Sequence, residues 1–288
     1  MTKVMITGGS GFVGAETIKL LQANNIKIFN YDLMLGYDIR DFEQLDKVVF
    51  ELKPDRILHL AAIARFADAD KDPKLAFETN VLGTMNVVKA AKKYHIPLVF
   101  SSTGSATMPL DEYEPPFDDD IPARGNSVYG VSKAIAEYYV KLHTPHIILR
   151  YAHLYGADKR YHGLIGGFLS RIERGLAPKL YGGKQSNSMT YIKDVARANL
   201  LALTAPWDSY NQTYNIGSPE EITAEDAGKI ICEVFGYKGK IERHKARTVD
   251  PARFCINTKK AETMLKFKAE YGFRKGLMEM KQEMLLKK

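Results

Sequence analysis

The chain has 288 residues, which allows one large domain or two compact ones and is long enough to bury a substantial core. Apolar residues make up 45% and charged residues 26%, a composition that excludes disordered and fibrous proteins. No segment approaches the roughly 18 uninterrupted apolar residues of a membrane span, and the start MTKVMITGG lacks the build of a signal peptide. We therefore expect a cytoplasmic protein without a membrane partner. Its two cysteines, Cys232 and Cys255, are too few for a disulfide framework.

The charge balance favours one kind of partner over another. Lys and Arg number 41 against 34 Asp and Glu, which gives a net charge of +7. The basic residues are scattered along the chain and form no stripe interleaved with aromatic residues, so we expect a small anionic metabolite and no nucleic acid. No metal site is expected either, because metal-ligand spacing is absent among the histidines His95, His143, His146, His162 and His244.

Short apolar runs alternate with helical stretches through the first half of the chain. The runs KVMIT, IKIFNYD, RILHLAA, PLVFSS and HIILRY are typical of strands, and amphipathic helices are predicted over 12–24, 74–94 and 127–143. Strands separated by helices form parallel βαβ units, and unbroken apolar runs suit strands that are covered on both faces. The sequence therefore predicts an α/β protein with a doubly wound parallel sheet of Rossmann type over residues 1–151.

The alternation loosens after residue 151. A strand is predicted at MTYI, a helix from Asp194, a strand at TYNIGS, and a helix from Thr223, where the string Thr-Ala-Glu-Asp is typical of a helix cap. We expect residues 152–288 to form mainly a smaller C-terminal α/β lobe that binds the substrate, with about 189–217 returning to the first domain. Because no Pro-rich linker separates the halves, they should share one interface.

A glycine-rich string, TGGSGFVG at 7–14, follows the first strand and opens the first helix. Glycines three residues apart allow a sharp turn, a close approach to a pyrophosphate and close packing of helix on strand. The start of the helix then offers free N–H groups and the positive end of its dipole to the phosphates. The residues expected to contact a dinucleotide here are Gly8, Gly11, Phe12, Val13 and Gly14.

An acidic residue, Asp32, ends the second strand about twenty residues further along. A carboxylate at this place can accept hydrogen bonds from both ribose hydroxyls. It would repel a 2′-phosphate, and the next residues, Leu33 and Met34, are not basic. The sequence therefore predicts NAD rather than NADP as cofactor.

The string YGVSK places Tyr129 and Lys133 four residues apart on one helix face. The spacing alone means little, because Tyr271 and Lys275 share it. Position favours the first pair, which follows a strand ending at Thr103, at the mouth of the sheet. A free tyrosine titrates near about 10, and a neighbouring ammonium with the oxidised nicotinamide would lower its pKa. Tyr129 is thus predicted as catalytic base, with Lys133 as its partner and Thr103 holding the substrate hydroxyl.

These motifs stand in order with Asp38 and Ile39 in YDIRD, HLAA at 59–62, Asn80 in TNVLGT, SST, and LRYAHLYG. The series resembles the extended short-chain dehydrogenase/reductase family, in its NAD-dependent epimerase/dehydratase group acting on nucleotide sugars, from residue 1 to about 217. The resemblance implies NAD as cofactor and a nucleotide sugar as substrate. It further implies cofactor contacts by Asp38, Ile39, Leu60, Ala61, Ala62, Asn80, Ser101, Tyr129, Lys133 and Tyr151.

Departures from the family pattern bear on the reaction. The family's dehydratases carry Asp and Glu directly after the Thr, and its decarboxylases keep a Glu there, whereas this chain has Gly104 and Ser105. Without a carboxylate, reversible hydride transfer remains, and we expect an epimerase acting at C4 of the sugar. A nucleotide-sugar 4-keto reductase is the alternative, favoured by the short stretch after Asp32 and by the chain's size. A non-catalytic dinucleotide-binding protein is disfavoured because Thr103, Tyr129 and Lys133 occur together.

The substrate lobe departs further. Many relatives have Asn at the position of His153 and a diphosphate-binding Arg at the position of Asn187, while Arg247 matches the family's second such Arg. Thr103, His153, Asn187 and Arg247 are therefore the candidate substrate-binding residues; His153 could equally fill space, and Arg247 could be an exposed loop residue.

The resemblance also implies a homodimer, in which the helices over 74–94 and 127–143 pair with those of the partner. Tyr138, Tyr139 and Val140 place apolar side chains on more than one helix face, which fits such a contact. Packing within one subunit would produce the same pattern.

Overall fold

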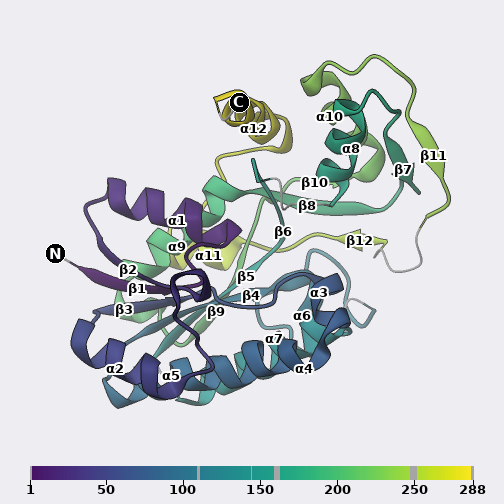
Figure 1. The fold of residues 1–288 in the computed structure, drawn as a ribbon. Coiled ribbons are helices and arrows are strands. Elements are labelled where there is room, and N and C mark those ends of the chain that lie inside the picture. Colours follow the sequence, from purple (N-terminus) through teal and green to yellow (C-terminus); the bar gives the residue numbers. More distant parts are fainter. Residues whose placement is uncertain (1, 109–110, 144, 159–162, 247–251, 287–288) are drawn as a thin grey trace.

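The computed structural model describes residues 2–108, 111–143, 145–158, 163–246 and 252–286. Its larger part is built on a six-stranded sheet with the strand order β2-β1-β3-β4-β5-β9, in which every pair of neighbours is parallel (Figure 1). The strands are β1 (Lys3–Thr7), β2 (Lys27–Tyr31), β3 (Arg56–His59), β4 (Leu98–Thr103), β5 (His146–Tyr151) and β9 (Gln212–Ile216).

Helices cover both faces of this sheet (Figure 1). On one face lie α1 (Phe12–Ala23) and α9 (Ile192–Leu203), and on the other lie α2 (Phe42–Leu52), α5 (Thr84–Lys93) and α7 (Val128–His143). Side chains alternate along β1 between two cores: Val4 and Ile6 pack on the side of α9, and Met5 packs on the side of α2 and α5. Strands covered by helices on both faces need apolar residues on both, which explains the unbroken apolar runs in the sequence. The structure thus confirms the predicted doubly wound sheet.

Shorter elements connect these layers. The helix predicted over 74–94 contains a π-helical segment, so that α4 (Pro73–Phe77), η2 (Glu78–Gly83) and α5 follow one another without a break. The remaining elements of the larger part are η1 (Leu33–Leu35), α3 (Phe66–Lys71), α6 (Gly104–Thr107), η3 (Trp207–Ser209) and α11 (Lys259–Met264).

A smaller lobe lies above the carboxyl ends of the parallel strands (Figure 1). In it, β8 (Ser186–Tyr191) pairs with β10 (Glu221–Thr223), β12 (Arg253–Phe254) and β6 (His153–Tyr155), while β7 (Lys179–Tyr181) pairs with β11 (Glu242–His244). Its helices are α8 (Leu164–Glu173), α10 (Ala224–Phe235) and α12 (Phe273–Leu286). Thr223 caps α10 by accepting a hydrogen bond from the Asp226 N–H, as the sequence predicted.

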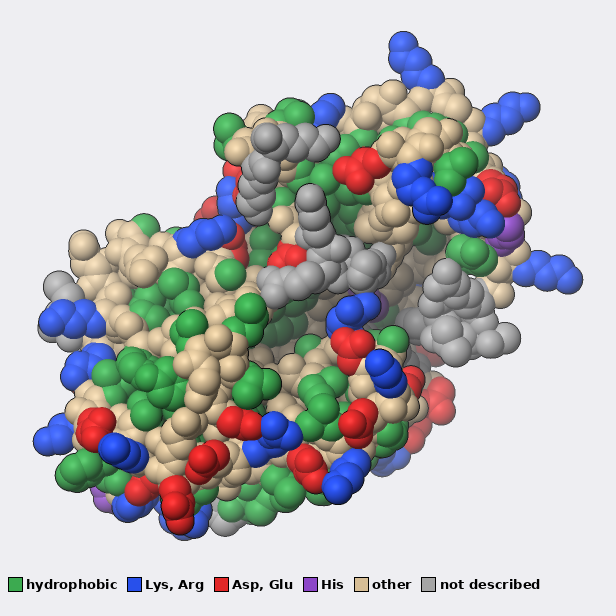
Figure 2. Space-filling view, in the orientation of Figure 1, with side chains coloured by type: hydrophobic (Ala, Val, Ile, Leu, Met, Phe, Trp, Pro, Cys, Tyr) green, Lys and Arg blue, Asp and Glu red, His purple; other side chains and the backbone are tan. Residues whose placement is uncertain are grey.

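The C-terminal half contributes to both parts. It supplies α9, which packs on α1, and β9, which pairs with β5 as the last strand of the six-stranded sheet. We propose that the larger part, with α9 and β9 included, binds the cofactor and that the smaller lobe binds the substrate. In the described part of the chain, no helix is long and apolar enough to cross a membrane. Figure 2 shows acidic and basic side chains interspersed along the larger part of the molecule, without a continuous basic stripe on that face.

Candidate functional site

The loop after β1 is shaped by glycines, two of which have no space for a Cβ without a shift of the neighbouring backbone. Gly8 has φ +73°, and a Cβ there would lie 2.6 Å from the backbone N and Cα of Ala61. A Cβ at Gly14 would lie 2.5 Å from the carbonyl oxygen of Gly8. Helix α1 begins at Phe12, which is followed by Val13, and has Gly11 as its N-cap residue. Within the described residues, no side chain forms a capping hydrogen bond there. The start of α1, with the positive end of its dipole, is therefore a suitable binding place for a pyrophosphate.

Asp32 lies at the carboxyl end of β2 and is directed at this loop. Its Oδ2 accepts a hydrogen bond from the Ser10 N–H at 2.9 Å, and its Oδ1 accepts one from the Met34 N–H at 2.9 Å. Each carboxylate oxygen keeps a second acceptor site, which is what two ribose hydroxyls need. The geometry of the glycine cradle and the aspartate is compatible with a dinucleotide without a 2′-phosphate, and contacts of these residues with the cofactor stay a prediction.

Asp38 and Ile39 lie beyond η1. The Asp38 carboxylate accepts hydrogen bonds from Arg40 Nη2 at 2.6 Å and Nε at 2.9 Å, and this pairing holds the pKa of Asp38 below its usual value. Ile39 is buried against Gly83, where a Cβ would lie 2.6 Å from its Cδ1 atom. Their contact with an adenine stays a prediction.

Asn80 and Ser101 serve the protein's own backbone in this structure. The Asn80 amide accepts from the Ile63 N–H at 2.8 Å and donates to the Ile63 carbonyl at 3.0 Å and to Ser132 Oγ at 2.9 Å. Ser101 Oγ donates to the His59 carbonyl at 3.0 Å. Both side chains thus fix the segment after β3, which contains the predicted cofactor residues Leu60, Ala61 and Ala62.

Sequence analysis missed a buried chain of hydrogen bonds centred on His59. Thr84 Oγ1 donates to the Asn80 carbonyl at 2.6 Å, so it accepts from His59 Nε2 at 2.9 Å, and Nδ1 accepts from Thr7 Oγ1 at 2.6 Å. The ring is therefore neutral, and burial lowers the pKa of His59 to about 3. The chain joins the ends of β1 and β3 to η2, and its only signal in the sequence is a histidine inside an apolar strand.

The predicted catalytic residues meet at the carboxyl end of β4. Thr103 ends that strand, Tyr129 lies in the first turn of α7, and their side chains are hydrogen-bonded to each other. Lys133 follows one turn later, with Nζ 4.1 Å from the centroid of the Phe100 ring. Phe66 packs its ring edge to face against Tyr129 at 5.5 Å. The structure thus places Thr103 beside Tyr129, and Lys133 one turn further along the same helix against Phe100.

Burial dominates the protonation of this group. It raises the pKa of Tyr129, a shift that the hydrogen bond with Thr103 opposes, and it lowers the pKa of Lys133 to about 7. In the protein alone, burial therefore works against a Tyr129 phenolate. A role for Tyr129 as a base would require positive charge close to the phenol.

Tyr151 ends β5 next to Thr103, with which it pairs in the strand register. Its hydroxyl donates to Asn199 Oδ1 at 2.6 Å, and Asn199 Nδ2 donates to Thr17 Oγ1 at 2.9 Å. Burial raises the pKa of Tyr151, so the residue stays a neutral donor. A contact of Tyr151 with the cofactor is a prediction that these bonds leave open.

The candidate substrate residues flank one aromatic side chain. His153, on β6, meets the ring of Phe254 edge to face at 5.3 Å, and Asn187, on β8, is the register partner of Phe254. The Oδ1 atom of Asn187 is buried and has no hydrogen-bond partner within the described residues. Arg247 lies outside the described residues. Phe254 itself escaped the sequence analysis, because nothing in its local sequence links it to the strand end 150 residues earlier.

Phe254 also closes the space beside Gly104. A Cβ at Gly104 would lie 3.1 Å from Phe254 Cζ, and the ring stacks on Phe117 at 5.8 Å and is fully buried. A Cβ at this position would require the Phe254 ring to shift by a few tenths of an ångström. The residue directly after Thr103 is thus a glycine packed closely against an aromatic ring, and it carries no carboxylate.

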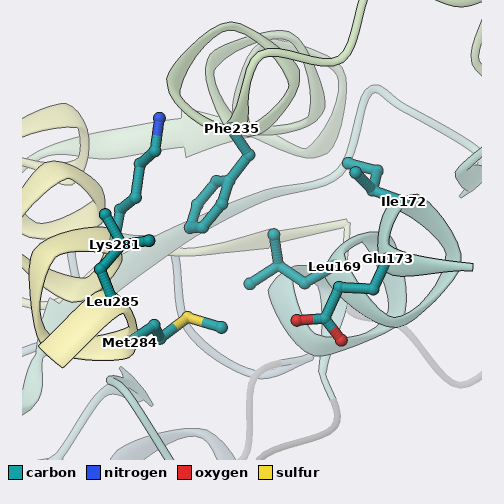
Figure 3. Close-up of a pocket in the computed structure, with 7 residues that line it drawn as sticks. All are labelled: Leu169, Ile172, Glu173, Phe235, Lys281, Met284 and Leu285. Atoms are coloured by element: carbon teal, nitrogen blue, oxygen red, sulfur yellow. The ribbon is translucent and has the colours of Figure 1, made fainter. Parts of the chain in front are cut away.

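A separate apolar cavity of about 160 Å³ lies between α8, α10 and α12 (Figure 3). It contains none of the predicted site residues, and it lies in the lobe away from the ends of β1 and β4. Its lining consists of Leu169, Ile172, Glu173, Phe235, Lys281, Met284 and Leu285.

Comparisons with known proteins agree with this geometry. The family described as NAD dependent epimerase/dehydratase matches residues 4–217. A candidate UDP-glucose 4-epimerase of Methanocaldococcus jannaschii is 30% identical over 95% of both chains. The structure of UDP-glucose 4-epimerase of Thermotoga maritima with UDP-glucose superimposes with a TM-score of 0.90, 25% identity and 99% coverage of both chains.

A dehydratase is similar at almost the same sequence identity, with a lower TM-score. The dTDP-glucose 4,6-dehydratase of Bacillus anthracis in complex with NAD has a TM-score of 0.83 and 26% identity, covering 100% of this chain and 97% of the other. Similarity alone therefore does not separate the two reactions. It does confirm the resemblance and the kind of cofactor predicted from the sequence: the chain belongs to the NAD-dependent epimerase/dehydratase family.

Proposed function

We propose that this protein is an NAD-dependent nucleotide-sugar epimerase that inverts C4 of the sugar. The observation that carries the proposal is the Thr103, Tyr129 and Lys133 group with Gly104, packed against Phe254, directly after it. This group can move a proton and support hydride transfer, and the adjoining position has no carboxylate for eliminating water. The UDP-glucose 4-epimerases among its relatives support the same reaction.

The residues divide the chemistry between them. NAD, held by the glycine loop at 7–14 and by Asp32, would supply a reversible acceptor for the hydride of C4. Tyr129 takes the proton of the C4 hydroxyl as the hydride leaves and gives it back on return. Thr103 orients that hydroxyl through its bond with Tyr129, and the Lys133 ammonium favours the phenolate by its charge.

The substrate lobe would bind the nucleotide. We propose that His153 and Asn187 contact the diphosphate, because they stand at the diphosphate-binding positions of relatives and both neighbour Phe254. Asn187 would donate its amide N–H to the diphosphate, and its Oδ1 atom, which has no partner within the described residues, would accept a hydrogen bond from the sugar or base. Arg247 is proposed as the cationic anchor by its sequence position alone.

We also propose a homodimer. Four apolar side chains on α7 recur at helical spacing and are exposed by two fifths or more: Val131, Ile135, Tyr138 and Leu142. A stripe of this kind on a helix that already packs against the sheet needs a second covering partner. The pairing of the same helices within the family favours a second copy of this chain.

The experiment is a panel of UDP-, GDP-, dTDP- and CDP-sugars incubated with the protein and analysed for sugar stereochemistry. We expect interconversion of one pair of C4 epimers, with Tyr129→Phe as the inactive control. Loss of water to a 4-keto-6-deoxy sugar would contradict the proposal and favour a dehydratase. Stoichiometric oxidation of NADH or NADPH with a 4-keto sugar would favour the reductase instead.

A further inference from the structure

Two fully buried charged side chains lie directly behind the catalytic group. The Glu137 carboxylate on α7 accepts hydrogen bonds from Arg150 on β5, from Nε to Oε1 at 3.0 Å and from Nη2 to Oε2 at 2.8 Å. Their side chains are 1% and 0% exposed. Ser102 Oγ on β4 donates to the same carboxylate at 2.5 Å. Glu137 therefore ties α7 to two neighbouring strands at once.

These ties are made next to the catalytic residues. Ser102 and Arg150 face each other in the register of β4 and β5, and each immediately precedes a predicted site residue. Glu137 follows Lys133 by one helical turn, on the same face of α7. The carboxylate thus fixes the helix that carries Lys133 to the strand that ends at Thr103.

Stability alone does not account for this ion pair. A buried pair loses much of its attraction to the cost of desolvation, and well-packed apolar residues of similar volume often hold a fold as firmly. Arg150 needs further partners to be buried, and its Nη1 donates to the carbonyls of Ile121 at 2.6 Å and Asp119 at 3.2 Å. A set of charges this costly to bury calls for a second role.

The charges around Lys133 indicate that role. Lys133 is 2% exposed, and Glu137 is the group whose negative charge opposes the effect of burial on the pKa of Lys133. On the other elements, His59 of β3 is a neutral ring, Arg150 of β5 is positive, and the charged side chains of α3, α4 and α5 lie at the surface. Glu78 of η2 is half-buried, and its carboxylate is paired with another lysine, since Lys74 Nζ lies 3.8 Å from Glu78 Oε1.

We propose that Glu137 is a positioning residue of the catalytic group: its carboxylate holds α7 against β4 and supplies the negative charge that keeps Lys133 protonated beside Tyr129. The proposal rests on the proposed function for the role of Lys133. Glu137 acts through Lys133, because a neutral Lys133 would no longer favour the Tyr129 phenolate. Ser102 and Arg150 hold the carboxylate in place.

Two variants separate charge from geometry. Glu137→Gln removes the charge while keeping the size of the side chain and an oxygen that can accept from Arg150. Ser102→Ala removes one hydrogen bond to the same carboxylate and leaves the charge. If charge matters, the proton affinity of Lys133 falls at least tenfold in Glu137→Gln and changes less than threefold in Ser102→Ala.

The first measurement needs no substrate. Protein labelled with ¹³C in lysine is titrated by NMR, and the Cε signal of Lys133 is assigned by its absence in Lys133→Arg. We expect the midpoint of Lys133 to move at least one pH unit downward in Glu137→Gln. Because this readout does not involve turnover, it stands even if the nucleotide-sugar panel finds no reaction. An unchanged midpoint in folded Glu137→Gln would overturn the proposal.

A further variant covers the case in which Glu137→Gln does not fold. Lys141 Nζ lies 3.9 Å from Glu137 Oε2 and is 39% exposed, so Lys141→Met should fold and leave the carboxylate less neutralised. The proton affinity of Lys133 should then rise about twofold. No rise would refute the electrostatic link between Glu137 and Lys133.

The second measurement is the pH profile of kcat on the substrate that the panel identifies. Lys133 must be charged for catalysis, so its deprotonation sets the alkaline limb, and this limb should move to lower pH in Glu137→Gln together with the NMR midpoint. A purely structural role would lower kcat equally at every pH. A moved midpoint with an unmoved alkaline limb would therefore also contradict the proposal.

Discussion

The larger part, built on the six-stranded sheet, and the smaller lobe differ in how far short sequence motifs determine their candidate sites. In the first, the glycine loop, Asp32 and the Tyr129 helix all lie where parallel βαβ units must place them, at the carboxyl ends of strands. In the second, His153 and Asn187 meet at Phe254, which reaches them from a two-residue strand far along the chain. Short motifs at strand ends thus predict the residues that this chain shares with its family. The residues in which this chain departs from the family depend on contacts between segments far apart in the sequence.

The catalytic base gives the largest expected effect. Tyr129→Phe removes the hydroxyl that carries the proton and keeps the ring that packs on Phe66. Turnover should fall by about 10²–10⁴-fold or more, the contribution of a general base, while the Kd for NAD stays nearly unchanged. Steady-state assays and NAD titrations of the same preparation test this, and full activity of the variant would show that another group is the base.

The same contrast explains what sequence could and could not predict. Five of the six parallel strands followed from apolar runs that alternate with helices, and the sixth lies where a strand was predicted at TYNIGS. The capped helix after Thr223 followed from its capping string. The Glu137–Arg150 pair had only weak signals, a glutamate one turn after Lys133 and an arginine in an apolar strand. The contact of Phe254 with Gly104 had none, because it depends on how two distant segments pack.

His59 tests the polar chain in the larger part of the molecule. The unfolded chain takes up a proton on this residue below about pH 6.5, whereas the folded protein does so only near pH 3. Between these values the unfolded state binds more protons, so stability falls as the pH falls. From pH 7 to 5 the loss from this residue should be about 2 kcal/mol, measured by denaturant unfolding and absent in His59→Gln. Equal losses in both proteins would show that His59 is not held neutral.

Two glycines with similar backbone angles compare the two regions directly. A Cβ added at Gly8 (φ +73°) would lie 2.6 Å from the backbone of Ala61. A Cβ added at Gly175 (φ +68°), in the lobe, would have no neighbour within 4 Å among the described residues. Replacing Gly175 by Ala should cost about 1 kcal/mol of stability and leave NAD affinity unchanged. Gly8→Ala adds a steric clash in the cradle and should weaken NAD binding at least tenfold. Equal NAD affinities for both variants would exclude the predicted pyrophosphate site.

Asp32 sharpens the assignment of the cofactor. Its carboxylate would face a 2′-phosphate as a like charge, so NAD should bind at least tenfold more tightly than NADP, equivalent to about 1.4 kcal/mol. Asp32→Asn should reduce this preference. Calorimetric titration with both dinucleotides tests it, and equal affinities in the unmodified protein would remove the role given to Asp32.

Substitutions in the exposed apolar stripe of α7 should have the smallest effect on the candidate site, because they are expected to change the oligomeric state. Light scattering should return about twice the chain mass of 32.4 kDa, and Ile135→Lys should shift the protein toward monomer. Trp207→Lys is a matched control, because Trp207 is exposed by 63% but lies in η3. A single-chain mass at micromolar concentration would reject the dimer.

The fate of the sugar's own hydrogen tests the central claim most directly. A nucleotide sugar identified by the panel is prepared with deuterium at C4 and incubated with the protein and NAD. We predict that the epimer forms with deuterium still at C4 and with no net change in absorbance near 340 nm, because the hydride leaves and returns within one turnover. Loss of the deuterium from C4, or consumption of reduced cofactor in step with product, would contradict epimerisation by Tyr129, Lys133 and Thr103.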